Sequence, residues 1–169
     1  MGKLEQKITF ASVLLLFAFS KPLFSAAPPE GKDPGARIMN FVLENQNGKM
    51  TKLSSLISGK KSVVYFFMGC CTHCVGELKK LSELNAKLEA RGVQMVGVQY
   101  YGNNQMCKAN VERFHFPGSI LGDAKAEVCG KLGVGEFTVI TVDSKGVILY
   151  RGTNYDRQAI EKSLELSKK

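Results

Sequence analysis

The sequence has no tryptophan, only two histidines and no internal repeat or low-complexity block. The uncharged run near its N-terminus covers only residues 8–20, whereas a membrane-spanning helix needs about 20 apolar residues. The formal net charge is +8, but no aromatic side chains are interleaved with the basic ones as on a nucleic-acid-binding surface. These absences disfavour a membrane span and a nucleic-acid partner, and the charge indicates a solvated basic surface.

The N-terminus has the order of segments that is typical of an export signal. Lys3 and Lys7 precede the uncharged run 8–20, and small residues follow at positions 25–27. A basic, then an apolar, then a small-residue segment characterises secretory signal peptides. We predict a signal peptide over residues 1–27, with an uncleaved anchor as the alternative. The protein is then exported to the bacterial periplasm or the extracytoplasmic face of the membrane.

The rest of the chain predicts a single domain. Residues 28–36 are rich in proline, glycine and charge, which is typical of a flexible tether. The stretch 37–169 is long enough for one domain with its own core and too short for two ordinary ones. Strand-like and helix-like segments alternate along it, and Asn47-Gly48 indicates a tight hairpin turn near its start. This pattern predicts an α/β fold with a mixed central sheet flanked by helices.

A Cys-x-x-Cys pair, Cys71 and Cys74, lies between a strand-like apolar run at 63–68 and a segment with leucines at helical spacing. A thiolate at position 71 would meet the positive end of the helix, which lowers a thiol pKa. Cys74 would follow one turn later, where it can resolve a mixed disulfide. The spacing therefore predicts thiol–disulfide exchange, which requires no organic or metal cofactor.

Several residues around this pair resemble the secreted thioredoxin-like proteins of the TlpA/ResA type. In that family an aromatic pair, a small residue and Trp-Cys-x-x-Cys are followed by a glutamate three residues on. Here the aromatic pair is at 66–67, the glutamate is Glu77, and the segment 138–146 is similar to the late strand and hairpin of the family. The resemblance covers 37–169 and implies a three-layer thioredoxin-like fold with an extra N-terminal β-hairpin. It also implies that Glu77 relays a proton to or from Cys74, a solvated helix residue being the alternative.

Two positions depart from the family pattern. Cys70 stands at the tryptophan position, where it can fill space, compete with Cys71 for Cys74, or supply a metal ligand. Phe137 stands where the family has a cis-proline before Thr138. Without that proline, the sequence leaves open whether the peptide bond of this loop is cis or trans. We expect Phe137 and Thr138 to line the substrate groove.

His73 lies between the two cysteines, as in the Cys-x-His-Cys of oxidases and isomerases such as DsbA and protein disulfide isomerase. The resemblance implies that His73 stabilises the Cys71 thiolate and makes the disulfide more oxidising. An exposed histidine of little effect is the alternative. The direction of electron flow stays open, because the overall resemblance includes many reductants.

Copper binding or delivery, as in the SCO family, is the alternative function. Cys70 and Cys74 form a Cys-x-x-x-Cys pair similar to that family, and soft thiolates suit Cu(I). The expected distal histidine is not identifiable, because His115, the other histidine, lies in an apolar Phe-His-Phe-Pro setting. A peroxiredoxin is disfavoured by the absence of a Pro-x-x-x-Thr-x-x-Cys sequence.

The remaining cysteines, Cys107 and Cys129, lie in predicted helices beside the sheet. A second disulfide and two buried thiols are both compatible with that placement, because linkage requires Cα atoms within about 7 Å of each other. Taken together, the residues predict a monomeric, exported thiol–disulfide oxidoreductase. Its partners would be protein thiols or disulfides, including a membrane or periplasmic redox protein, and no nucleic acid.

Overall fold

The computed structural model describes residues 27–69, 72–135 and 137–165. The helices and strands follow one another as β1 (Glu30–Gly31), β2 (Arg37–Ile38), β3 (Val42–Asn45), β4 (Met50–Lys52), α1 (Leu53–Ile57), β5 (Ser62–Met68), α2 (Thr72–Glu89), β6 (Gln94–Tyr100), α3 (Asn104–Phe114), β7 (Ser119–Asp123), α4 (Glu127–Leu132), β8 (Phe137–Val142), β9 (Ile148–Gly152) and α5 (Arg157–Ser163). The predicted signal peptide falls almost wholly outside these ranges. None of the described helices has the length and apolarity needed to span a bilayer.

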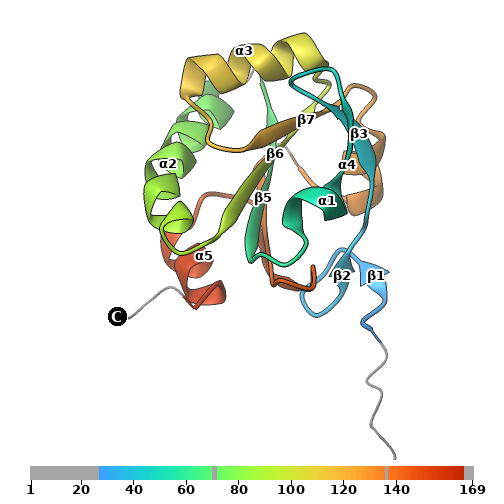
Figure 1. The fold of residues 1–169 in the computed structure, drawn as a ribbon, viewed down its shortest axis with the longest axis vertical. Helices are drawn as coiled ribbons and strands as arrows, with labels where there is room; N and C mark the ends of the chain where they lie inside the picture. Colours follow the sequence, from blue (N-terminus) through green and yellow to red (C-terminus); the bar gives the residue numbers. More distant parts are fainter. Residues whose placement is uncertain (1–26, 70–71, 136, 166–169) are drawn as a thin grey trace, which may run out of the picture.

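A seven-stranded mixed sheet forms the centre of the domain, in the order β4-β3-β7-β6-β5-β8-β9 (Figure 1). Strands β5, β6 and β7 are parallel, whereas β8 and β9 run antiparallel to their neighbours. Val64 of β5 pairs with Val96 of β6 on one side and with Ile140 of β8 on the other. The carboxyl ends of the three parallel strands therefore share one edge of the sheet.

Helices cover both faces of the sheet, which confirms the predicted three-layer architecture. Successive side chains of a strand point to opposite faces, so Val63, Tyr65 and Phe67 enter one apolar core while Val64 and Phe66 enter the other. The first core is closed by α2, α3 and α5, and the second by α1 and α4 (Figure 1). Because both faces are buried, β5 is apolar along its whole length.

The predicted N-terminal hairpin is also confirmed. Strands β3 and β4 pair antiparallel, and β3 continues onto the edge of β7. Gly48 turns the chain with a φ of 75°, a left-handed conformation that glycine adopts without steric cost, and its N–H donates to the Asn45 carbonyl. The hairpin thereby extends the sheet by two strands.

Residues 28–36, for which the sequence predicts a flexible tether, are held against the domain. Strand β1 pairs in parallel with β2, and the Gly35 N–H donates to the Ile148 carbonyl at 2.9 Å. The Arg151 guanidinium on β9 donates to the carbonyl of Lys32 at 2.9 Å. These contacts come from distant parts of the chain, so the composition of the segment alone does not reveal them.

Candidate active site

The junction between β5 and α2 brings the chain from the centre of the sheet into the first turn of a long helix. Cys70 and Cys71 lie outside the described residues, so the assignment of Cys71 as the nucleophile stays a prediction. Cys74, in the first turn of α2, is fully buried in the apolar cluster that also holds Phe67 and Leu78. The second cysteine of the motif is therefore shielded from solvent, as suits a resolving thiol.

Phe137 is placed beside this junction by the register of the sheet. It begins β8 and pairs with Phe67 near the end of β5. Its half-buried side chain packs against the cluster that contains Cys74, and its ring lies 4.6 Å from that of His73, centroid to centroid. His73 itself is exposed. The histidine of the motif and the residue at the proline position of the family are thus in direct contact, which the sequence analysis did not predict.

Thr138 points into the protein. Its side chain is buried, and its hydroxyl oxygen accepts a hydrogen bond from the Gly135 N–H at 3.0 Å. The lining of a substrate groove by Phe137 and Thr138 stays a prediction. The peptide bond whose isomer the sequence left open involves Glu136, which lies outside the described residues.

Glu77 lies one helical turn beyond Cys74 and is 5% exposed. One of its carboxylate oxygens is 2.8 Å from the ammonium of Lys80, whose own side chain is mostly exposed. Glu77 is therefore an ionisable group withdrawn from bulk water, held by a lysine at the surface, rather than a solvated helix residue. The transfer of a proton between Glu77 and Cys74 stays a prediction.

Gln99 and Asn110 form a buried amide pair behind the same junction. The Asn110 amide donates to the Gln99 side-chain oxygen at 2.8 Å, and Gln99 is completely buried at the end of β6. Neither residue was predicted from the sequence as part of the site. The available signal was a glutamine directly after the residues 95–98, which carry no polar side chain, since a buried polar side chain needs a partner.

Cys107 and Cys129 are free thiols on opposite faces of the sheet, the first in the core under α3 and the second in the core under α4. The alternative of a disulfide between them is therefore excluded. Burial raises the pKa of the Cys107 thiol to about 12. The pKa of the Cys129 thiol is also raised above its usual value. Burial is the larger cause, and a hydrogen bond with Asp123 adds to it. Neither thiol has the environment of a reactive cysteine.

A metal centre is not assembled by the described part of the chain, which contains no group of three or more histidine, cysteine, aspartate or glutamate side chains close enough to hold an ion. Cys70, the proposed third thiolate, lies outside that part. His115 ends α3 with a φ of 47° and is exposed.

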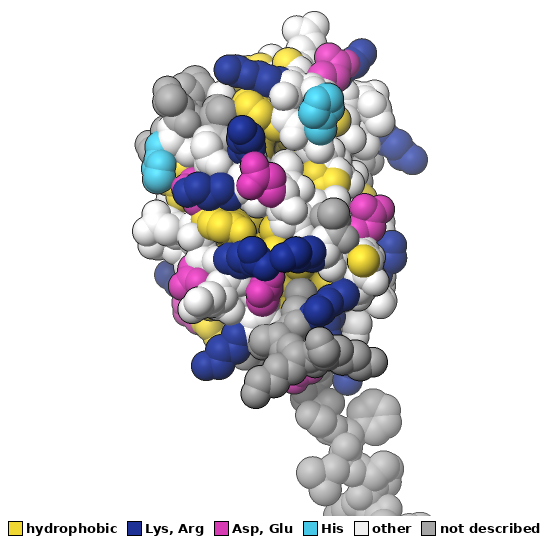
Figure 2. Space-filling view, turned by 90° about the vertical axis from the view of Figure 1, so that its left-hand side faces the viewer, with side chains coloured by type: hydrophobic (Ala, Val, Ile, Leu, Met, Phe, Trp, Pro, Cys, Tyr) yellow, Lys and Arg dark blue, Asp and Glu magenta, His cyan; other side chains and the backbone are white. Residues whose placement is uncertain are grey.

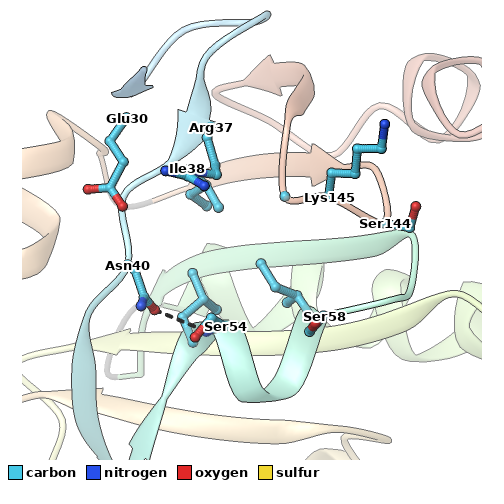
Figure 3. Close-up of a pocket in the computed structure, with 11 residues that line it drawn as sticks. Glu30, Arg37, Ile38, Asn40, Ser54, Ser58, Ser144 and Lys145 are labelled. Atoms are coloured by element: carbon cyan, nitrogen blue, oxygen red, sulfur yellow. Dashed lines mark hydrogen bonds between the residues drawn. The ribbon is translucent and has the colours of Figure 1, made fainter. Parts of the chain in front are cut away.

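A pocket of about 380 Å³ lies at the other end of the sheet (Figure 3). It is lined by Ser54, Ser58 and Lys145, among others, and Ser54 donates its backbone N–H to the Asn40 side chain. Ser62 at the start of β5 pairs with Val142 at the end of β8, so the turn that carries Lys145 is remote from Cys74. The pocket is therefore separate from the redox motif.

The face formed by α2 and α5 carries no extended surface of one charge. Figure 2 shows lysine and arginine side chains interspersed with aspartate and glutamate on this side. Two pairs of opposite charges on this face form ion pairs, Lys80 with Glu77 and Arg157 with Glu161.

Comparison with known proteins places the fold and the motif in a family. A curated relative, the thiol-disulfide oxidoreductase ResA of Bacillus thuringiensis (strain Al Hakam), is 23% identical over 151 residues, which are 86% of this chain and 87% of ResA. The peroxidoxin BcpB of Mycobacterium tuberculosis superposes with a TM-score of 0.70 at 20% identity, over 83% of this chain and all of that one. A secreted disulfide oxidoreductase of the same organism, homologous to E. coli DsbE, gives 0.63 at 18% identity, over 75% of this chain and 95% of that one.

The family model of the AhpC/TSA family matches residues 34–151, which include all strands from β2 to β8 and most of β9. The match spans the central sheet, the Cys-x-x-Cys junction and Phe137. By its sequence and its thioredoxin-like fold, the chain belongs to the AhpC/TSA family.

Proposed function

We propose that this protein is a thiol–disulfide oxidoreductase in which Cys71 exchanges with a partner protein and Cys74 resolves the mixed disulfide. The observation that carries the proposal is Cys74, buried in the first turn of α2, the helix that follows strand β5. Membership of the AhpC/TSA family and the similarity to ResA support this chemistry over copper delivery.

The reaction takes place in two exchanges. The Cys71 thiolate attacks one sulfur of a partner disulfide, the partner's S–S bond breaks, and the released sulfur takes up a proton. Cys74 then loses its proton and attacks the Cys71 sulfur, which releases the second partner thiol. The partner gains two electrons, and Cys71 and Cys74 become a disulfide. The reverse order oxidises a partner dithiol.

Glu77 serves as the proton relay for the resolving step in this proposal. Cys74 is fully buried, so bulk water cannot readily take its proton. The Glu77 carboxylate lies one turn along the same helix and is itself withdrawn from solvent. Lys80 at 2.8 Å compensates its charge, and the carboxylate can pass the proton toward the surface.

Export and a protein partner complete the proposal. The basic, apolar and small-residue segments at the N-terminus favour secretion, and one structural relative is described as secreted. The exposed His73 and the half-buried Phe137 form an accessible aromatic surface beside the motif, which suits the backbone and side chains of a protein substrate. We propose protein thiols or disulfides outside the cytoplasm as substrates.

The test is a redox titration of the protein, expressed without residues 1–27, in glutathione buffers. We expect a single two-electron couple that is abolished by Cys71→Ser and by Cys74→Ser and retained in Cys70→Ser. A parallel titration with Cu(I) tests the copper alternative. Tight stoichiometric copper binding that depends on Cys70, without a two-electron couple, would overturn the proposal.

A further inference from the structure

The pocket at the far end of the sheet is built by three separate parts of the chain (Figure 3). Residues of β1 and β2, residues of α1, and the turn between β8 and β9 all contribute to its lining. Its volume of about 380 Å³ equals about a dozen water molecules at ~30 Å³ each, and small-molecule sites begin at about 300 Å³. The buried side chains of Ile38, Leu53 and Ile57 supply its apolar lining. The pocket therefore has room for an organic molecule with an apolar part.

Most of the polar groups in this lining are hydrogen-bond donors. Side chains with N–H or O–H groups come from Arg37, Asn40, Ser54, Ser58, Ser144 and Lys145. The side-chain oxygen of Asn40 already accepts the Ser54 N–H at 3.1 Å, which leaves the NH₂ group of this amide for a ligand. In the described part of the chain, the hydroxyls of the three serines form no hydrogen bond with the protein. The pocket thus offers several donors that the fold does not use.

The pocket also carries an excess of positive charge. Arg37 and Lys145 line it, whereas Glu30 is the single carboxylate among the described residues of the lining. Within those residues neither cation forms an ion pair, with Glu30 or with any other carboxylate. Figure 3 shows the Lys145 ammonium directed away from Ser54, and its flexible four-carbon stem allows it to fold over a bound anion. A cleft with a surplus of one charge attracts ligands of the opposite charge.

We propose that this pocket binds a phosphate monoester that carries an apolar group. The guanidinium of Arg37 matches the geometry of a phosphate and can donate two parallel hydrogen bonds to it. A phosphate monoester has three acceptor oxygens and a charge of about −1.5 to −2 at pH 7, so it can also use the serine hydroxyls and the Asn40 amide. A carboxylate has only two oxygens and would leave more of these donors unpaired. The apolar group then contacts the buried aliphatic side chains of the lining.

This binding goes beyond the proposed redox function and does not depend on it. No cysteine is among the described residues that line the pocket. The turn that carries Lys145 is remote from Cys74, because it lies at the end of the sheet where β5 begins and β8 ends. Loss of the redox couple would leave the inference intact, and a failure to bind phosphate esters would leave the redox proposal intact.

Isothermal titration calorimetry of the purified full-length protein with phenyl phosphate tests the proposal. We expect saturable binding of one molecule per chain. Benzoate keeps the ring but has a carboxylate, and inorganic phosphate lacks the ring, so each should bind at least about tenfold more weakly. Absence of saturable binding would overturn the site, and benzoate binding as tight as that of phenyl phosphate would overturn the assignment of a phosphate.

Charge variants should change the affinity in opposite directions. Arg37→Gln should weaken phenyl phosphate binding at least about tenfold, because it removes a charged donor. Glu30→Gln removes the carboxylate that repels the anion, so it should tighten binding about two- to fivefold. Lys79→Gln, at an exposed position on α2 outside the pocket, makes the same change in net charge as Arg37→Gln and should leave the affinity unchanged. Equal affinities in Arg37→Gln and Lys79→Gln would overturn the proposal.

An uncharged variant locates the ligand without altering the electrostatics. Ser58 is exposed and follows α1 with a φ of −58°, which leucine adopts without strain. Ser58→Leu should lower the affinity at least about fivefold, because its side chain occupies volume that the ligand needs. Unchanged affinity in a folded Ser58→Leu protein would place the ligand elsewhere and overturn the site.

The segment that forms one wall of the pocket gives a second measurement. Glu30 and Arg37 lie on β1 and β2, so phenyl phosphate should slow proteolysis within residues 28–36, and Arg37→Gln should abolish this protection. Cleavage at the same rate with and without bound phenyl phosphate would contradict the proposed site. Vesicles that contain phosphatidic acid identify the source of the phosphate. Competition with phenyl phosphate indicates a lipid headgroup, and its absence indicates a soluble ester.

Discussion

The imidazole of His73 lies against the phenyl ring of Phe137, with the two ring planes tilted by 58° and the centroids 4.6 Å apart. One residue stands inside the Cys-x-x-Cys motif and the other begins β8, so the contact joins the motif to the strand beside it. Tilted aromatic pairs at this separation are attractive by about 0.5–1.5 kcal/mol. The contact therefore helps to fix the histidine side chain next to the cysteines.

Replacement of His73 by proline should make the couple more reducing, because the imidazole no longer stabilises the Cys71 thiolate. Position 73 lies in the first turn of α2, where proline is tolerated. The midpoint potential in glutathione buffer measures the effect, and each tenfold change in the equilibrium constant corresponds to about 30 mV. His115→Asn is the matched control, since asparagine tolerates the left-handed backbone there. An unchanged potential in His73→Pro would show that the histidine does not tune the couple.

Phe137→Pro should preserve or increase exchange with generic protein disulfides. Proline restores the family residue at the rim of the predicted groove. It also removes the ring that packs against His73. The rate of reduction of a model protein disulfide measures the effect, with circular dichroism as the check on folding. A folded variant that loses activity would instead give the aromatic ring a function of its own, in binding a specialised partner.

Glu77→Gln should slow the resolving step, because the amide cannot take the proton from Cys74. General-base catalysis typically contributes about 10²–10⁴-fold, so we expect a loss of at least 10-fold near neutral pH and a smaller loss at high pH. The decay of a mixed disulfide with a chromogenic thiol, followed against pH, is the measurement. Glu83→Gln, an exposed position on the same helix, should leave the profile unchanged. Equal pH profiles for both variants would contradict the relay.

The two buried thiols predict a loss of stability in alkali. The pKa of Cys107 is raised from 9.0 to about 12, so above pH 9 the unfolded chain loses this proton while the folded protein retains it. The unfolded state then binds fewer protons, and the free energy of unfolding falls as pH rises, by up to about 1.4 kcal/mol per pH unit. The free energy of unfolding, measured with urea, should fall between pH 8 and pH 10.5. This fall should be about 2 kcal/mol smaller in Cys107→Ala than in the wild type. An identical drop in both proteins would mean that Cys107 is not shielded as the structure indicates.

Arg151→Met should release the segment before β2. The guanidinium donates hydrogen bonds to the carbonyls of Lys32, Leu132 and Gly133. A hydrogen bond from a charged donor contributes up to about 1.5–3 kcal/mol to the free energy of unfolding. Limited proteolysis should cut within residues 28–36 faster in the variant than in the wild type. Lys108→Met, at an exposed position on α3, is the control. Equal cleavage rates would show that β1 is held by its strand pairing alone.

Segments with a strong local pattern were predicted from the sequence. The apolar run 63–68 became β5, which begins one residue earlier, at Ser62. Helix α4 begins at Glu127, after Asp123 has ended β7 and accepted the Cys129 N–H with its carboxylate. Ala126 then adopts a left-handed conformation before the helix starts. A side-chain cap of this kind depends on the tertiary position of β7.

The parts of the site that the sequence did not reveal depend on contacts between separate elements. The Gln99–Asn110 pair joins β6 to α3, and the His73–Phe137 contact joins α2 to β8. Neither pair has a spacing that places its members on one face of one element. The burial of Glu77 likewise follows from packing of α2 on the sheet, since its helical position alone fits both an exposed and a buried carboxylate.

The central sheet separates Cys107 from Cys129 in the folded domain, but this separation does not exist before the chain has folded. In an oxidising compartment the closed sheet protects both thiols without any reducing enzyme, because a disulfide between them would require the layers to come apart. The extended chain has no such barrier, and all five of its cysteines are then open to pairing. For an exported chain, as proposed, the yield of correctly oxidised protein should therefore depend on how fast the sheet forms relative to oxidation of the nascent chain.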